Sequence, residues 1–178
     1  MTSIQCVFIL HGKGGSPEGS SKQIQSCLED QQPELRGPFN RPLLLHSDAS
    51  VLAEDSLADL RGRNFPSGSV VIGISLGGLL AAKLQEDGRR DLPVICISSP
   101  TWADGVRLEQ KMLNRIAFYS SQDEVIRGRT KDWPQLANAY DLPWLSHDTD
   151  RHAQALTKLI LAELRHQKWL RFDSTRQS

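Results

Sequence analysis

One segment near the middle of the chain constrains the fold more than any other. Residues 69–82 read SVVIGISLGGLLAA, so a run of β-branched residues is followed at once by small residues and leucines. The first half has the composition of a strand buried on both faces. The second half is typical of a helix that packs closely on its neighbours. A buried strand that passes directly into a helix indicates a layered α/β architecture.

Apolar runs of strand length alternate with helical patterns along the whole chain. The predicted strands are residues 7–10, 42–45, 70–74, 94–97, 116–119 and 142–145. The predicted helices cover about residues 19–31, 50–61, 76–87, 104–113, 129–138 and 150–168. This alternation predicts a mostly parallel sheet with helices on both faces. We expect a single domain over residues 1–168 and a polar C-terminal tail at 169–178.

The composition excludes several classes of function. The 178-residue chain has 21 basic and 21 acidic side chains, so it lacks the positive charge with which nucleic-acid-binding proteins contact phosphates. Residues 70–82, the nearest candidate for a membrane span, are fewer than the roughly 18 needed and contain a serine and three glycines. The N-terminus has no basic segment typical of a signal peptide. The three cysteines are expected to be reduced, in a cytoplasmic protein.

A serine at the strand–helix junction is the first candidate for chemistry. Residues 73–77 match the G-x-S-x-G pattern of a nucleophilic serine, in the strand–turn–helix setting that this pattern requires. The sharp turn leaves no room for side chains two positions on either side of Ser75, and Gly73 and Gly77 meet that need. The helix that follows favours negative charge near the serine. Ser75 is therefore the predicted nucleophile.

A second motif follows the first predicted strand, where residues 11–17 read HGKGGSP. With the serine motif, it makes the chain resemble the α/β-hydrolase superfamily, whose first core strand commonly ends in His-Gly before an oxyanion loop. The resemblance covers essentially the whole chain, but it is specific only at these two motifs. It implies a minimal α/β-hydrolase fold of about six strands in the order 2-1-3-4-5-6. It also implies that the N–H groups of Lys13 and Leu76 form an oxyanion hole, and that His11 braces the loop.

The superfamily places its acid and then its histidine after the serine. In the loop after the strand at 116–119, Asp123 stands two residues before a valine, as the acid often does, and Glu124 is its rival. His147 follows the last predicted strand and is the expected base. Residues 146–148 depart from the Gly-x-Gly-His often found there, so His152 remains an alternative.

The environment of the site is also predicted in outline. Residues 98–115 leave room for one helix and no cap domain, so we expect an open site that prefers short acyl chains. Trp102 either lines the acyl side or packs against the next helix, whereas Trp133 and Trp144 are expected to pack inside. No spacing of cysteines, histidines and carboxylates suggests a metal site, and no cofactor motif is found.

These features predict a serine hydrolase that cleaves a small carboxylic ester or thioester through a Ser75–His147–Asp123 triad and an acyl-enzyme. Amide hydrolysis by the same groups stays open. A hydrolase-fold binding or scaffold protein without turnover is the alternative. Nucleotide binding is a weaker one, because the glycine loop lacks the lysine of a P-loop. The sequence gives no indication of the oligomeric state.

Overall fold

The computed structural model describes residues 6–32, 35 and 50–169. Its main sheet has five strands in the order β1-β2-β3-β6-β7, and all neighbouring strands are parallel. They are β1 (Cys6–Leu10), β2 (Ser69–Ile74), β3 (Val94–Ile97), β6 (Arg115–Tyr119) and β7 (Asn138–Asp141). The strand predicted at 42–45 lies outside the described residues, and the other five follow the predicted order.

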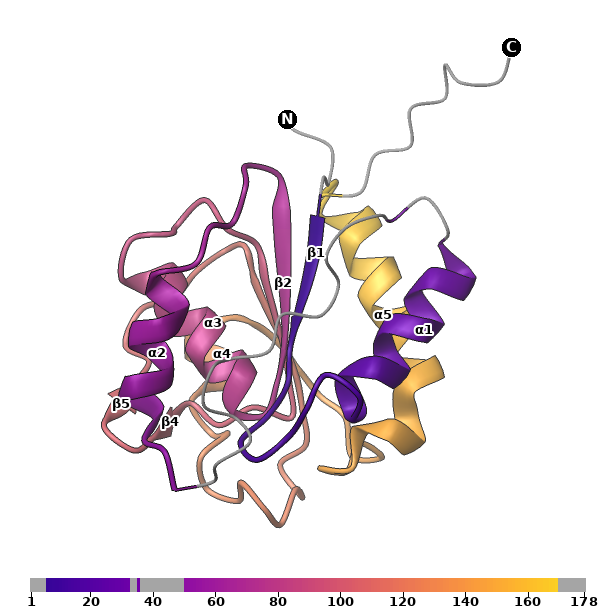
Figure 1. Ribbon diagram of the computed structural model, residues 1–178. Helices are drawn as coiled ribbons and strands as arrows, with labels where there is room; N and C mark the ends of the chain where they lie inside the picture. The colour runs from indigo at the N-terminus through magenta and orange to yellow at the C-terminus, as the bar shows by residue number, and fades with distance from the viewer. Residues whose placement is uncertain (1–5, 33–34, 36–49, 170–178) are drawn as a thin grey trace.

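Helices cover both faces of this sheet, as predicted (Figure 1). One face carries α1 (Ser20–Gln31) and α5 (Ala153–His166), with the 3₁₀ helix η1 (Thr149–His152) leading into α5. The other face carries α2 (Ala53–Arg61), α3 (Leu76–Glu86) and the short α4 (Trp133–Leu136). No helix in the described part of the chain is long and apolar enough to cross a bilayer.

The strands β1, β2, β3 and β6 each divide their apolar residues between two cores. In β1, Val7 and Ile9 pack on the α1–α5 side, whereas Phe8 and Leu10 pack on the α2–α3 side. Successive side chains of a strand point to opposite faces, so a strand covered on both sides must be apolar throughout. This requirement is the reason why the central strands are so easily seen in the sequence.

The prediction of a helix at 104–113 is wrong, because a β-hairpin occupies this region. Strands β4 (Trp102–Ala103) and β5 (Val106–Arg107) pair in antiparallel fashion. The two residues between them, Asp104 and Gly105, have φ angles of 44° and 84°. Two-residue hairpin turns need such angles, and Asp-Gly is one of their preferred sequences. The connection between β3 and β6 therefore holds a small hairpin and no cap domain.

The last strand lies four residues earlier than predicted, at Asn138–Asp141 instead of 142–145. Among the described strands, β7 pairs only with β6, and its residues are half-buried or exposed. An edge strand of this kind needs no apolar run, so the sequence pattern missed it. The helix predicted at 129–138 is correspondingly short, and Pro134 lies in its first turn, where the missing N–H costs no hydrogen bond.

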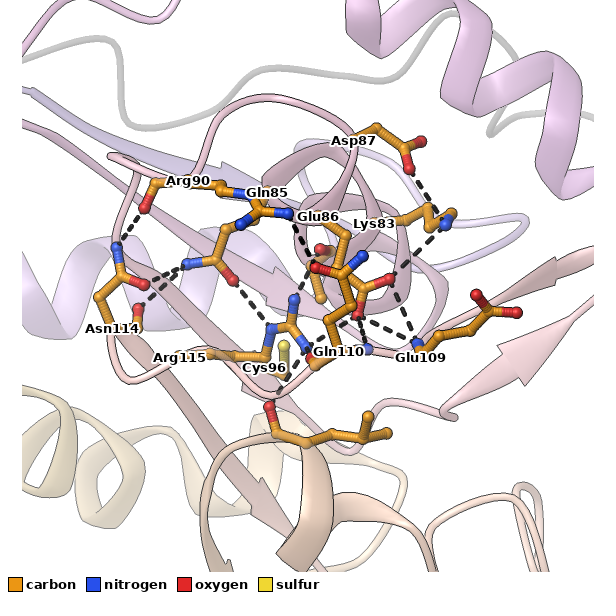
Figure 2. A network of polar contacts seen from close by, with 12 residues as sticks. Lys83, Gln85, Glu86, Asp87, Arg90, Cys96, Glu109, Gln110, Asn114 and Arg115 are labelled. Atoms are coloured by element: carbon orange, nitrogen blue, oxygen red, sulfur yellow. Dashed lines mark hydrogen bonds and ion pairs between the residues drawn. The ribbon is translucent and has the colours of Figure 1, made fainter.

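A buried polar network joins α3 to the beginning of β6 (Figure 2). The Arg115 side chain is fully buried, and burial lowers the pKa of its guanidinium. Its acceptors are Gln85 Oε1 and Ala82 O at 2.9 Å, Gln110 O at 3.0 Å, Leu136 O at 3.2 Å and Glu86 Oε1 at 3.3 Å. Since Arg115 begins β6, the network lies at the amino edge of the sheet.

Several single-residue predictions concern the core. The three cysteines are unpaired thiols, and only Cys96 is fully buried, which raises the pKa of its thiol to about 12. Trp133 is buried as expected, and its indole N–H donates to the carbonyl oxygen of Ser99 at 2.8 Å. Trp169 packs against the α1–α5 core. Residues 170–178 of the predicted tail lie outside the described residues.

Candidate active site

Ser75 occupies the turn between β2 and α3, at the carboxyl edge of the sheet. Its φ and ψ are 52° and −123°, a combination that L-residues rarely adopt. Its N–H donates to the carbonyl oxygen of Ile97 at 2.8 Å, and its own carbonyl accepts the N–H of Gly78 at 3.1 Å. These bonds attach the strained residue to β3 and to α3. The chain therefore makes the sharp strand–helix turn that the serine motif predicts.

Close packing around this turn explains the glycines of the motif. A Cβ atom on Gly77 would lie 2.6 Å from the carbonyl oxygens of Leu10 and His11. A Cβ atom on Gly73 would lie 2.3 Å from the Cα of Gly78. Both obstructing groups are backbone, which cannot rotate aside, so a side chain at either position would push β1 or α3 away from Ser75.

The predicted acid and base are hydrogen-bonded to each other. His147 Nδ1 donates to Asp123 Oδ2 at 2.9 Å. The Asp123 side chain is fully buried, and its Oδ1 accepts the N–H groups of Val125 and Ile126 at 2.9 and 3.4 Å. The bond to Nδ1 leaves Nε2 of His147 as the nitrogen that can exchange a proton with a substrate or nucleophile. Glu124, the rival acid, is exposed on the same turn.

Ser75 and His147 line the same cavity, which has a volume of about 170 Å³. Its remaining wall comes mainly from the loop after β1, including His11, Gly12 and Lys13. The serine, acid and histidine come from the loops after β2, β6 and β7, which meet at one edge of the parallel sheet. No group of His, Cys, Asp and Glu within the described ranges could hold a metal ion.

The two predicted oxyanion donors flank the serine. Leu76 is the first residue of α3, and Lys13 belongs to the loop that brings Gly12 against Ser75. A Cβ atom on Gly12 would be 3.0 Å from the Ser75 Cβ. Neither the Lys13 N–H nor the Leu76 N–H has an acceptor in the part of the chain that the structure describes. Such N–H groups can stabilise negative charge that develops beside the serine.

Two side chains hold the loop after β1 in place. His11 is buried, and its Nδ1 donates to the carbonyl oxygen of Gly12 at 2.9 Å. Burial lowers the pKa of His11, which favours the neutral imidazole. Lys13 Nζ lies 2.8 Å from Asp104 Oδ2 in the turn of the β4–β5 hairpin. The hairpin is therefore in contact with the loop that carries the predicted oxyanion donor Lys13, a contact that no sequence pattern predicted.

His152, the alternative base, has other partners. Its Nε2 lies 3.0 Å from Ser146 Oγ, and its ring centroid lies 5.4 Å from that of Trp144. Trp144 was predicted to be a packing residue, and that prediction is wrong. The side chain is 45% exposed and lines a second cavity beside His147. The reason is that residues 142–145 form a loop beyond β7 and not a strand of the sheet.

Trp102 lies away from both cavities that His147 lines. It is 40% exposed, and the guanidinium carbons of Arg107 and Arg129 lie 5.7 and 5.6 Å from the centroid of its ring. Such contacts are favourable cation–π interactions. The structure therefore supports neither prediction for Trp102. The side chain does not line the candidate active site, and a β-hairpin stands in place of the helix that it was expected to pack against.

No protein-family model and no curated protein matches the sequence, whereas solved structures match the fold. Est1E from Butyrivibrio proteoclasticus has a TM-score of 0.65 and 13% identity, over 93% of this chain and 89% of its own. XC6422 from Xanthomonas campestris, an α/β serine hydrolase without a lid, has a TM-score of 0.65 and 16% identity over 96% and 85%. Mouse α/β-hydrolase domain-containing protein 10 has a TM-score of 0.70 and 9% identity over 94% and 92%. The chain has the α/β-hydrolase fold.

Proposed function

We propose that this protein is a serine hydrolase that cleaves a carboxylic ester or thioester of a small molecule. The observation that carries the proposal is the Asp123–His147 hydrogen bond of 2.9 Å, next to a strained serine that shares a cavity with the histidine. A buried carboxylate bound to one nitrogen of an imidazole prepares the other nitrogen to deprotonate a serine. The likeness to an α/β serine hydrolase without a lid supports the proposal at the level of the fold.

The proposed reaction has two halves. In the first, Ser75 Oγ attacks the carbonyl carbon while His147 Nε2 takes the serine proton, and Asp123 stabilises the imidazolium. The N–H groups of Lys13 and Leu76 donate to the carbonyl oxygen as it becomes negative. His147 then protonates the leaving oxygen or sulfur, its bond to carbon breaks, and the acyl group remains on Ser75. In the second half, water attacks the acyl carbon while His147 Nε2 takes a proton from it. His147 then returns this proton to Ser75 Oγ, the bond between Oγ and the acyl carbon breaks, and the carboxylic acid leaves.

The size of the cavity at Ser75 supports a small acyl group. Its volume is about 170 Å³, and residues 98–115 supply only the β4–β5 hairpin. There is no cap between β3 and β6 to enclose a long apolar chain. Acetyl esters and thioesters are therefore suitable first substrates.

Labelling with a fluorophosphonate probe tests the proposal, because the probe reacts with activated serines. The wild-type protein should be labelled and should hydrolyse p-nitrophenyl acetate. Ser75→Ala should lose both activities and keep its circular dichroism spectrum. Ser121→Ala is the matched control, since Ser121 is exposed on the loop that carries Asp123, and it should be labelled normally. Persistent labelling of Ser75→Ala would show that another residue is the nucleophile, and an unreactive wild-type protein would favour the scaffold alternative.

A further inference from the structure

A second cavity adjoins the candidate active site. It has a volume of about 370 Å³ and lies between the loop at 122–125 and the loop at 143–147. His147 lines this cavity as well as the one that contains Ser75. The two cavities thus meet at the residue that we propose moves the proton.

Apolar side chains are exposed to solvent in this second cavity. Val125 is 61% exposed and Trp144 is 45% exposed, and both line it. Single exposed apolar residues are common on protein surfaces, but these two come from different loops and share one hollow beside His147. The contact between the Trp144 and His152 rings restricts the indole before a ligand arrives, which reduces the entropy lost on binding.

The charges of the cavity indicate what kind of group it accepts. Its formally charged side chains are the carboxylates of Asp123 and Glu124, and no lysine or arginine lines it. Asp123 is already hydrogen-bonded to His147 and to two backbone N–H groups, so it has little capacity for a ligand. Glu124 is exposed, so solvent screens its attraction for a cation as well as its repulsion of an anion, and no basic side chain is present to bind an anion. An uncharged apolar group fits these walls best.

The direction of proton transfer indicates which half of the substrate the apolar group in the second cavity belongs to. In the proposed reaction, His147 protonates the leaving oxygen or sulfur, so the leaving group must lie against the imidazole. We propose that the second cavity binds the alcohol or thiol half of the substrate, that this half is apolar and uncharged, and that Trp144 and Val125 determine the specificity for it. This inference rests on the proposed function.

A series of acetate esters with constant acyl group tests the inference. The wild-type kcat/KM for 3,3-dimethylbutyl acetate should exceed that for methyl acetate by about tenfold or more, because the larger alcohol buries apolar surface. Acetylcholine has nearly the same shape as 3,3-dimethylbutyl acetate but carries a positive charge, and it should be the poorer substrate. An equal or better kcat/KM for acetylcholine would overturn the assignment of an uncharged group.

Variants separate binding from a structural role. Trp144→Ala should lower kcat/KM for 3,3-dimethylbutyl acetate by about tenfold, mainly through KM, and change that for methyl acetate by no more than about twofold. Val125→Ser should act in the same direction and, being largely exposed, should fold normally. Trp102→Ala is the control, because Trp102 is similarly exposed and lines neither cavity. Equal losses on both esters, or no loss in either cavity variant, would overturn the inference.

A measurement without turnover separates this inference from the proposed function. Titration with 3,3-dimethylbutan-1-ol should give a saturable NMR shift of the Trp144 indole N–H, a signal that Trp144→Phe identifies by its loss. A saturable shift in a protein whose Ser75 is not labelled would reject the proposed hydrolase and leave the binding site standing. A labelled Ser75 with no saturable shift would reject the apolar site and leave the hydrolase standing.

Discussion

At the scale of single residues, Asp123 determines how His147 is oriented. One carboxylate oxygen accepts the imidazole N–H and the other accepts two backbone N–H groups. The acid is therefore held in place before any substrate arrives, which is how preorganised sites avoid reorganisation during the reaction. His152 is held by Ser146 and Trp144 instead. Two histidines five positions apart thus have different partners and different expected roles.

Alanine substitutions should separate these roles. His147→Ala should reduce kcat for p-nitrophenyl acetate by roughly 10³-fold or more, because it removes the group that we propose deprotonates Ser75. His152→Ala should reduce it by about tenfold or less, because it removes a neighbour of Trp144 and not the base. Steady-state kinetics on variants with the same melting temperature would check this order. A larger loss in His152→Ala would move the base to position 152.

At the scale of elements, the approach of β1 to the β2–α3 turn depends on glycine at position 77. Its missing side chain lets the carbonyl groups of Leu10 and His11 lie where a Cβ would otherwise be. Gly62 is a useful contrast, because it follows α2 with a φ of −74°. A Cβ there would lie no closer than 3.4 Å to its nearest neighbour, the Asp59 carbonyl oxygen.

These two glycines should respond differently to alanine. Gly77→Ala should lower the free energy of unfolding by about 1–3 kcal/mol, as overpacking does when the obstructing atoms cannot move aside. It should also weaken fluorophosphonate labelling, since β1 leads into the loop that carries the proposed oxyanion donor Lys13. Gly62→Ala should change stability by less than about 1 kcal/mol, and in the stabilising direction. Urea unfolding curves would show the difference, and equal midpoints for the two variants would contradict it.

At the scale of the whole molecule, the buried polar network and the candidate active site lie at opposite edges of the sheet. The candidate active site lies at the carboxyl ends of the strands, whereas the Arg115 network lies where β6 begins (Figure 2). Glu86 is almost completely buried within this network, and its carboxylate also accepts the N–H groups of Glu109 and Gln110. A buried ion pair of this kind is costly to break from one side only.

Removal of the buried cation should therefore destabilise the fold without changing the chemistry. Arg115→Met should lower the free energy of unfolding by about 3–5 kcal/mol. It removes the donor to the buried carbonyl oxygens of Ala82 and Leu136, and it leaves the buried Glu86 with Lys83, at 3.5 Å, as its remaining cationic partner. Adding Glu86→Gln should recover part of that loss. Arg61→Met is the control, since its pair with Asp87 is at the surface and such pairs contribute about 0–1 kcal/mol. Urea titration measures the stabilities, and kcat per folded molecule should stay at the wild-type value.

The sequence by itself determined the central strands, the helices that flank them and the serine turn. Buried parallel strands must be apolar throughout and the turn at Ser75 must have glycines beside it, so both leave local patterns. The resemblance to α/β-hydrolases carried the prediction to Asp123 and His147, and the structure brings these two into contact. That they act in catalysis stays a prediction.

Only the tertiary structure decided the remaining features, because they depend on contacts between distant segments. β7 is marked by its pairing with β6 and not by an apolar run of its own. The Asp-Gly turn became recognisable once Trp102–Ala103 lay against Val106–Arg107. Trp144 has a large, mostly apolar side chain of the kind that is often buried, but the loop after β7 places it at the surface beside His147. Local composition shows what a segment can bury, whereas the packing of the other segments decides what it does bury.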